Sequence, residues 1–349
     1  MATLLLLLFL AAFVSAAVAF DSIPTISFDE GYKPLFGDGN IVKSNGGRNV
    51  NLELNRWSGA GFISSDLYNH GFFSASIKLP SDYTAGVVVA FYTSNGDLFE
   101  HTHDELDFEF LGNIKGKEWR IQTNVYGNGS TSRGREERYL LPFDPTAEPH
   151  RYSILWTADT IIFYIDNIPI REVLRSGAMG GDYPSKPMAL YATIWDGSLW
   201  ATQGGKYKAN YKYSPWVAEF SGLVLQGCRT DPRLVRHPSS EEDDRCADSD
   251  AQLEAADFAD LTPKKREAMR RFRGRYMTYS FCYDENRYPV AFPDCDVVPS
   301  EQEKFWKSGD VKVDWEKVLR RRKPRQRSKR RSRVAARGVE EDKKTQAAV

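Results

Sequence analysis

Acidic and apolar residues alternate strictly between positions 105 and 110 of the chain. In an extended strand, side chains at positions i, i+2 and i+4 lie on the same face. Glu105, Asp107 and Glu109 would then share one surface, while the Leu and Phe residues between them enter the core. Three carboxylates in a row repel one another, and a strand face with a purely structural role gains nothing from that repulsion. The segment therefore predicts a catalytic site.

Glycoside hydrolysis gives this arrangement a chemical reason. A retaining enzyme uses two carboxyl groups ~5–5.5 Å apart, one as nucleophile and the other first as acid and then as base. The α-carbons of Glu105 and Glu109 would be ~13 Å apart in a strand, and side chains leaning together on a twisted sheet close most of that distance. Asp107 can share a proton with the nucleophile, and mutual repulsion keeps one carboxyl protonated near neutral pH.

The same residues have two other interpretations, an exposed acidic strand face and a cation-binding site. His101 and His103 precede the carboxylates, and imidazole and carboxylate groups are common metal ligands. No second cluster of ligands appears elsewhere in the sequence, so we expect neither a metal nor a cofactor. We expect His103 to orient or cover the carboxylates.

Short strands separated by turns make up most of the chain, from Ile26 to Leu225. They alternate with period two, are rich in β-branched and aromatic residues, and are divided by Gly, Asn, Asp and Pro. The segment Ile161–Ile170 predicts a hairpin with Asp166-Asn167 at its turn. Because no helical period persists here, we predict an all-β protein, an antiparallel β-sandwich of the jelly-roll, concanavalin-like kind.

The ends of the chain differ from this body. Residues 1–20 hold a long apolar run followed by Ala17-Val18-Ala19, which has the small-x-small form of a signal-peptidase site. A membrane anchor is the alternative, but the run is short for a span of ~20 residues. We therefore expect residues 1–19 to be a signal peptide and the protein to be secreted, with no membrane association.

The four cysteines, Cys228, Cys246, Cys282 and Cys295, lie in a C-terminal extension at residues 226–298. An exported chain with four cysteines favours two disulfides, and three pairings are possible. We expect the short-loop pairing, Cys228–Cys246 and Cys282–Cys295. The sequence of the extension also predicts a helix at residues 257–276, with Thr262-Pro263 at its start. We predict that residues 299–349 form a disordered tail.

Several motifs together resemble the xyloglucan endotransglucosylase/hydrolase family of plant cell walls, within the family 16 glycoside hydrolases. HDELDFEFLGN carries the likeness, with AGVVVAFYTSN before it and QTNVYGNG after it. FDPT, YSILW, DNIPIR, WATQGG and C-x4-R-Y-P follow in the same order, so the resemblance covers residues 27–295 and implies a catalytic domain at residues 20–225. The basic tail and WDGSLW in place of the commoner WNADDW suggest the third subgroup.

The resemblance implies roles for individual residues. Glu105 corresponds to the nucleophile and Glu109 to the acid/base, with Asp107 assisting. Gly134 stands where the family has Asp, and residues 271–273 (Arg-Phe-Arg) replace a frequent Trp. The implied substrate-binding residues supply the amides, guanidinium groups and aromatic faces that hold neutral sugars: His103, Gln122, Thr123, Asn124, Gly134, Arg135, Glu136, Trp195, Leu199, Trp200, Gly204 and Arg287.

Two further features concern modification and the tail. The family's glycosylation signal after FLGN is lost, and Asn128-Gly129-Ser130 is the sole N-x-S/T sequence. Residues 320–349 hold 13 of the 47 basic residues but only 3 of the 47 acidic ones. A nucleic-acid-binding arm is one interpretation, but export argues against it. A solvated end, or a tether to anionic wall polysaccharide, remains.

The resemblance implies a secreted, monomeric enzyme of the cell wall, or apoplast, that acts on xyloglucan chains as donor and acceptor. We expect an endotransglucosylase. Two alternatives are a xyloglucan hydrolase, in which water is the acceptor, and a non-catalytic wall-binding lectin on the same sandwich. The carboxylate triad argues against the lectin, and spacing alone does not separate transfer from hydrolysis.

Overall fold

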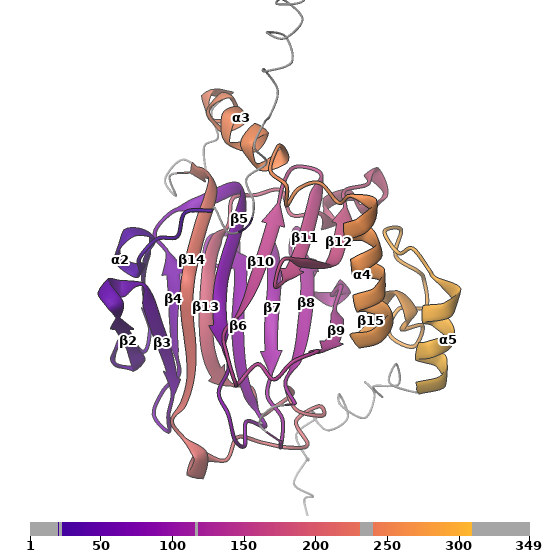
Figure 1. The fold of residues 1–349 in the computed structure, drawn as a ribbon. Helices are drawn as coiled ribbons and strands as arrows, with labels where there is room; N and C mark the ends of the chain where they lie inside the picture. The colour runs from indigo at the N-terminus through magenta and orange to yellow at the C-terminus, as the bar shows by residue number, and fades with distance from the viewer. Residues whose placement is uncertain (1–19, 21–22, 116–117, 231–239, 309–349) are drawn as a thin grey trace, which may run out of the picture. The chain divides into compact units, whose positions relative to one another are not determined.

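Two antiparallel β-sheets stacked face to face form the body of the protein (Figure 1). The computed structural model describes residues 20, 23–115, 118–230 and 240–308. The expected signal peptide and most of the expected tail lie outside the described residues.

Sheet A has eight strands, in the order β1 (Tyr32–Phe36), β4 (Ala60–Ser64), β13 (Ala189–Asp196), β6 (Val87–Ser94), β7 (Glu105–Leu111), β8 (Arg120–Tyr126), β9 (Glu137–Leu140) and β15 (Met277–Ser280). Sheet B has seven, in the order β12 (Ile168–Leu174), β11 (Thr160–Ile165), β10 (His150–Trp156), β5 (Leu67–Lys78), β14 (Trp216–Thr230), β3 (Asn49–Leu54) and β2 (Ile41–Ser44). The described α-helices are α2 (Phe28–Gly31), α3 (Ser240–Glu254), α4 (Pro263–Tyr276) and α5 (Pro299–Ser308). Short 3-10 helices occupy Asp38–Asn40, Asn45–Gly47, Thr131–Arg133, Gly177–Asp182, Tyr211–Tyr213 and Phe281–Tyr283.

The hydrophobic core fills the space between the two sheets. On β7 the alternation places Leu106, Phe108 and Phe110 inside it with 0% exposure, as predicted. The ring of Phe108 meets Phe163 of sheet B edge to face, with centroids 5.2 Å apart. The opposite side of β7, which carries the carboxylates, therefore faces away from sheet B. The predicted jelly-roll sandwich is confirmed.

The predicted hairpin is also confirmed. Strands β11 and β12 pair in antiparallel fashion, and Ile165 lies opposite Ile168 across the turn. Asp166 and Asn167 both have positive φ, 46° and 64°. Positive φ at both central residues is the geometry of a type I′ turn, which matches the twist of the strands.

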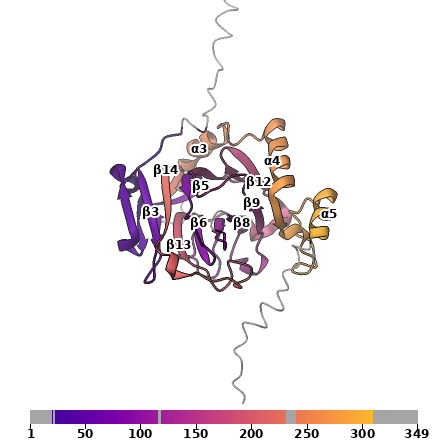
Figure 2. The same cartoon turned by 60° about the horizontal axis from the view of Figure 1, so that its bottom comes forward.

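The C-terminal extension becomes part of the sandwich rather than a separate layer. Strand β15 pairs with β9 and forms the edge of sheet A. Helix α4 packs against β12 of sheet B and against β9 and β15 of sheet A (Figure 1, Figure 2). The Arg273 guanidinium of α4 lies 2.6 Å from the buried Glu137 carboxylate of β9. Burial would raise the pKa of Glu137, but Arg273 and then Arg171 outweigh it and hold that pKa at about 2.

Both predicted disulfides are present. Cys228 of β14 is joined to Cys246 of α3, and their α-carbons are 5.2 Å apart. Cys282 is joined to Cys295, with a Cα separation of 5.5 Å. These separations are typical of disulfides.

Helix α4 has the predicted start but a shorter length than expected. Thr262 caps it by accepting a hydrogen bond from the Lys265 backbone N–H, and Pro263 occupies the first turn. Residues 257–261 precede the helix and are not part of it. The acidic segment that follows β14 is itself helical, forming α3.

Two expected boundaries differ from the structure. The division at Leu225 falls inside β14, which continues pairing with β5 up to Thr230. Residues 299–308 were expected to be disordered, but they form α5. The physical reason is Phe305, which is 1% exposed and lies with its ring centroid 5.1 Å from that of Tyr283. The buried Phe305 side chain anchors this short helix.

Candidate active site

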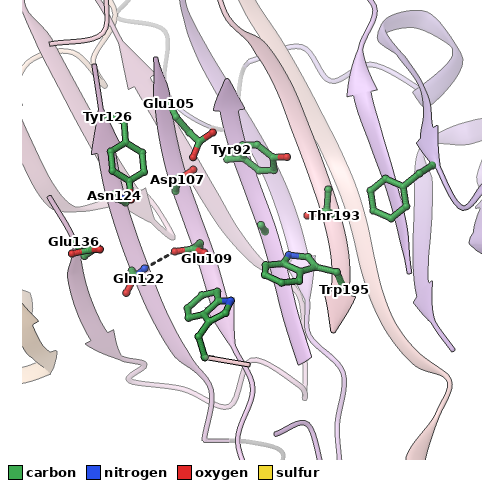
Figure 3. Close-up of a pocket in the computed structure, with 13 residues that line it drawn as sticks. Tyr92, Glu105, Asp107, Glu109, Gln122, Asn124, Tyr126, Glu136, Thr193 and Trp195 are labelled. Carbon is green, nitrogen blue, oxygen red and sulfur yellow. Dashed lines mark hydrogen bonds between the residues drawn. The ribbon is translucent and has the colours of Figure 1, made fainter. Parts of the chain in front are cut away.

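A cavity of about 510 Å³ lies over the outer face of sheet A (Figure 3). Its polar floor comes from neighbouring strands β7 and β8, which contribute Glu105, Asp107, Glu109, Gln122 and Asn124. Its aromatic walls are Phe36, Tyr92, Tyr126, Trp195 and Trp200. The three carboxylates predicted to share a face therefore do so, and they share it with a cavity.

Strand register explains which residues meet there. Glu109 lies directly opposite Ala90 of β6 on one side and Gln122 of β8 on the other. Asp107 lies between Tyr92 and Asn124, and Glu105 between Ser94 and Tyr126, in the same two pairings. Each carboxylate thus lies within a row of side chains that crosses the sheet at right angles to the strands.

The row through Glu109 has small residues on its β6 side. Beyond Ala90 it passes Thr193 of β13, Gly61 of β4 and Phe36 of β1. A Cβ atom at Gly61 would lie 2.7 Å from Cε1 of Phe36 and 2.9 Å from Cγ2 of Thr193. Small side chains therefore keep the floor low next to the acid, and Phe36 closes its far end.

Burial governs the protonation of all three carboxyl groups. It raises the pKa of Glu105, although Ser94, His103 and Asp107 act in the opposite direction. Burial and then the charges of Glu105 and Glu109 raise the pKa of Asp107 well above its usual range. Both causes favour the protonated form of Asp107.

The pKa of Glu109 is also raised. Burial is the main cause that raises its pKa to about 7, and the charges of Glu105 and Glu136 add to the rise. The side-chain amide of Gln122 donates to Glu109 Oε2 at 2.5 Å and lowers the pKa. A carboxyl group that exchanges its proton near neutral pH is suited to act as acid and then as base.

Five of the implied substrate-binding residues line the cavity: Gln122, Asn124, Glu136, Trp195 and Trp200. Trp195 and Trp200 form a tilted pair with ring centroids 6.0 Å apart. His103 is not among the lining residues but stands beside them. Its ring is edge-on to Tyr126 at 6.3 Å, and its charge favours the ionised form of Glu105.

Thr123 is turned away from the cavity, contrary to the resemblance. It lies between Gln122 and Asn124 on β8, so the period of two places its side chain on the core face. It is 0% exposed, and its hydroxyl accepts a hydrogen bond of 3.0 Å from Arg171. Thr123 therefore supports the sheet and does not reach a sugar in the cavity.

Arg135 is also withdrawn from the cavity. It is 0% exposed, lies 3.1 Å from the Asp182 carboxylate and 2.9 Å from Asp294, and stacks over Phe292. Gly134 beside it contributes a carbonyl oxygen, which accepts a hydrogen bond of 2.9 Å from Tyr288. Both residues tie the loop before β9 to the extension.

Arg287, Leu199 and Gly204 lie outside the lining as well. Arg287 forms a bidentate ion pair with Glu136, one of whose bonds measures 3.0 Å, and this carboxylate links it to the cavity. Leu199 is 80% exposed next to Trp200. Gly204, at φ 64°, lies in the loop that carries Trp200. In the segment 271–273, which stands where the family often has Trp, Phe272 is buried in the core and Arg273 pairs with Glu137.

Several lining residues were not predicted from the sequence: Phe36, Ala90, Tyr92, Tyr126 and Thr193. Tyr126 is two positions beyond Asn124 on β8, so strand alternation alone could have identified it. The others lie on β1, β6 and β13, and only the order of strands in sheet A reveals that these strands lie on the same side of β7 and share its outer face.

Asn128 is exposed, as a glycosylation site requires, and adopts φ 50° in the turn that follows β8.

Among the described residues, no three His, Cys, Asp or Glu side chains are arranged to hold a metal ion. Within the same ranges, no helix has both the length and the apolar character needed to cross a bilayer.

Two family models match separate parts of this chain. Residues 28–213 match the model of glycosyl hydrolases family 16, and residues 247–295 match that of the xyloglucan endo-transglycosylase (XET) C-terminus. The chain is 57% identical to "Probable xyloglucan endotransglucosylase/hydrolase protein 30" of Arabidopsis thaliana over 93% of each chain. It is 56% identical to protein 28 of the same series from the same plant, over 86% of this chain and 88% of that protein.

Among solved structures, one match is a prokaryotic β-1,3-1,4-glucanase (lichenase) from a mouse hindgut metagenome. It is 22% identical, with a TM-score of 0.47, and the match covers 58% of this chain and 97% of that one.

Proposed function

This chain belongs to the xyloglucan endotransglucosylase/hydrolase family, and from that premise we propose that it acts mainly as a retaining endotransglucosylase. It cleaves the β-1,4-glucan backbone of xyloglucan and rejoins the new end to another xyloglucan chain. The observation that carries the proposal is the row of three carboxyl groups on the cavity face of β7, among which burial raises the pKa of Glu109 to about 7.

In the first step, the ionised Glu105 attacks the anomeric carbon of a backbone glucosyl unit. The bond between that carbon and the leaving oxygen breaks, and the proton of Glu109 passes to the oxygen. A covalent glycosyl ester on Glu105 results, and Glu109 is left as a carboxylate. Asp107 remains protonated and donates to the neighbouring nucleophile, so that only one negative charge faces the sugar.

In the second step, Glu109 acts as a base. Its carboxylate takes the proton from the 4-hydroxyl of an incoming xyloglucan end, and the freed oxygen attacks the anomeric carbon. The ester bond to Glu105 breaks, which regenerates the nucleophile and retains the configuration after two inversions. A water molecule in place of the 4-hydroxyl would give hydrolysis by the same steps.

Aromatic surfaces on both sides of the carboxylate strand support transfer. Tyr126 rises from β8 on one side, while Tyr92, Trp195 and Phe36 lie toward β1 on the other. Aromatic faces and amide groups bind sugar rings on either side of the broken bond. A bound acceptor sugar has a high effective concentration and so competes with water for the intermediate.

A labelled-acceptor experiment tests this proposal. Xyloglucan is incubated with the enzyme, with and without a fluorescent xyloglucan oligosaccharide, and the polymer is separated by size. We expect label to enter the polymer at a rate that exceeds the appearance of new reducing ends. A fall in chain length with new reducing ends and no incorporated label would instead make the protein a hydrolase. Binding without either change would make it a lectin.

We further propose that the chain is cleaved near Ala19, exported to the cell wall and glycosylated at Asn128, and that it is monomeric. The support is the apolar run before Ala19 and the exposure of Asn128. The basic tail would tether the enzyme to anionic wall polysaccharide, with binding that weakens steeply as salt is added. N-terminal sequencing and a mass shift on deglycosylation check the first two points.

A further inference from the structure

A continuous row of side chains connects Glu109 to the C-terminal extension. Glu109 of β7 lies opposite Gln122 of β8, which in turn lies opposite Arg138 of β9. The Gln122 amide nitrogen donates to Glu109 Oε2 at 2.5 Å, and Arg138 Nε donates to Gln122 Oε1 at 2.6 Å. Both ends of one amide are therefore engaged, on opposite sides, by charged or titratable groups.

The chemistry of the two groups decides which way this amide faces. An amide presents an oxygen that only accepts and an NH2 group that only donates. A guanidinium group has five donor hydrogens and no acceptor, so it can bond only the oxygen. With the oxygen of Gln122 held toward Arg138, the NH2 group must point at Glu109. Without Arg138, the amide could turn over and present its oxygen to Glu109 instead.

We propose that Arg138 is a positioning residue that holds the Gln122 side chain with its NH2 group toward Glu109. The inference rests on the proposed role of Glu109 as acid and base. Gln122 is 5% exposed, so water offers its oxygen little alternative hydrogen bonding. Arg138 does not line the cavity and is not expected to touch the sugar.

Arg138 is in turn fixed by the extension. Its guanidinium carbon lies 4.9 Å from the ring centroid of Tyr279, which β15 brings to the edge of sheet A. Such stacking holds a guanidinium in a defined plane. The Tyr279 hydroxyl donates to Asp284 at 2.9 Å, which anchors the ring. The strand that the extension adds to sheet A thus supports the acid/base through two intermediate side chains.

The orientation of the amide alters the proton affinity of Glu109. An NH2 group donating to Glu109 favours the carboxylate, whereas an amide oxygen would accept from the protonated carboxyl and favour that form. Arg138 therefore keeps the pKa of Glu109 from rising further, so that Glu109 can release its proton and later accept one. The other charged or titratable groups that face Glu109 stay in place: Tyr92, Glu105, Asp107, Tyr126 and Glu136.

The test uses Arg138→Met in the full-length enzyme and measures kcat/KM for donor cleavage against pH. We expect the alkaline limb, where Glu109 loses its proton, to move up by about one pH unit, the size of a lost charge-assisted hydrogen bond. Arg138→Lys can also only donate, and should leave that limb close to its original position. Lower activity with both limbs unmoved in Arg138→Met would overturn the proposal.

A double-mutant cycle separates positioning from a direct charge effect. Gln122→Leu removes the donor and should itself raise the alkaline limb. The charge of Arg138 also lowers the pKa of Glu109 directly, but less than the Gln122 hydrogen bond does. If Arg138 acts mainly through Gln122, adding Arg138→Met to Gln122→Leu moves the limb much less than Arg138→Met alone does; an equal shift would mean direct electrostatics and refute positioning. Should Arg138→Met fail to fold, Arg138→Gln, which is neutral and can also accept, takes its place in the cycle.

A matched control keeps this proposal distinct from the proposed function. Glu109→Ala should lack the alkaline limb in its residual cleavage of xyloglucan, whose leaving group needs a proton in the wild type. If the limb persists in Glu109→Ala, the acid/base assignment fails. If the limb is lost in Glu109→Ala but does not move in Arg138→Met, only the positioning role fails.

Discussion

The proposed acid role of Glu109 predicts how the enzyme responds to alkali. The pKa of this partly buried carboxyl is raised to about 7, so the protonated fraction falls as the pH rises through that value. One pH unit above it, about one molecule in ten keeps the proton, and donor cleavage should fall about tenfold. The wild-type pH profile of kcat/KM with intact xyloglucan measures this limb directly.

Removal of the acid gives the matching magnitude. Glu109→Ala should lower cleavage of xyloglucan by about 10²–10⁴-fold, the usual contribution of a general acid. An oligosaccharide donor with an aryl leaving group of low pKa needs little protonation, so the variant should still form the glycosyl ester from it. With this donor, the first step should also become insensitive to alkali.

Two results would refute this reasoning. An alkaline limb near pH 7 that remains in Glu109→Ala would assign the titration to another group, and equal losses for the natural and activated donors would mean that Glu109 does not supply the proton. The acid limb provides an internal check, because it reports the protonation of Glu105 and should remain in the variant.

Three other variants test the cavity floor, the core beneath β7 and the extension. Gly61→Val should raise KM for the donor several-fold with little change in melting temperature, because its side chain displaces the Phe36 ring and fills the low floor next to Glu109. Phe108→Ala should lower the free energy of unfolding by about 3–5 kcal/mol in urea titration, since it leaves a cavity between the sheets. Replacing Cys282 and Cys295 together by Ser should lower the free energy of unfolding by about 3 kcal/mol in the same titration. A thiol reductant removes this bond from the wild type, but it should cause no further loss from that bond in the variant.

The sequence predicted that the three carboxylates share one face of β7 because the pattern is local. The period of two fixes which residues of β7 share a face, whatever the rest of the chain does. The same rule, applied to β8, separates Gln122 and Asn124 from Thr123. The motif resemblance assigned all three to sugar binding, so strand geometry corrects the resemblance at this position.

The walls of the cavity depend on pairings between distant segments. Tyr92 and Thr193 meet the carboxylates only because β13 pairs with β6 and β6 with β7. A hydrophobic pattern predicts the strands but not their order in the sheet. Phe36 lies four strands from β7 and could be placed only by the complete order of sheet A.

The extension shows the same division between local and distant information. Thr262-Pro263 marked the start of α4, because capping depends on neighbouring residues. The pairing of β15 with β9 could not be predicted, nor could the burial of Phe305 that stabilises α5. Both depend on surfaces that the sandwich presents only after it has folded.

Trapping the covalent intermediate tests the central claim most directly. A xyloglucan oligosaccharide carrying fluorine at C2 of the reacting glucosyl unit and a good leaving group is incubated with the enzyme, which is then digested and mapped by mass spectrometry. The glycosyl ester should lie on Glu105, and Glu105→Gln should form none. An ester on Glu109 or Asp107, or steady turnover of xyloglucan by the Glu105→Gln variant, would contradict the account.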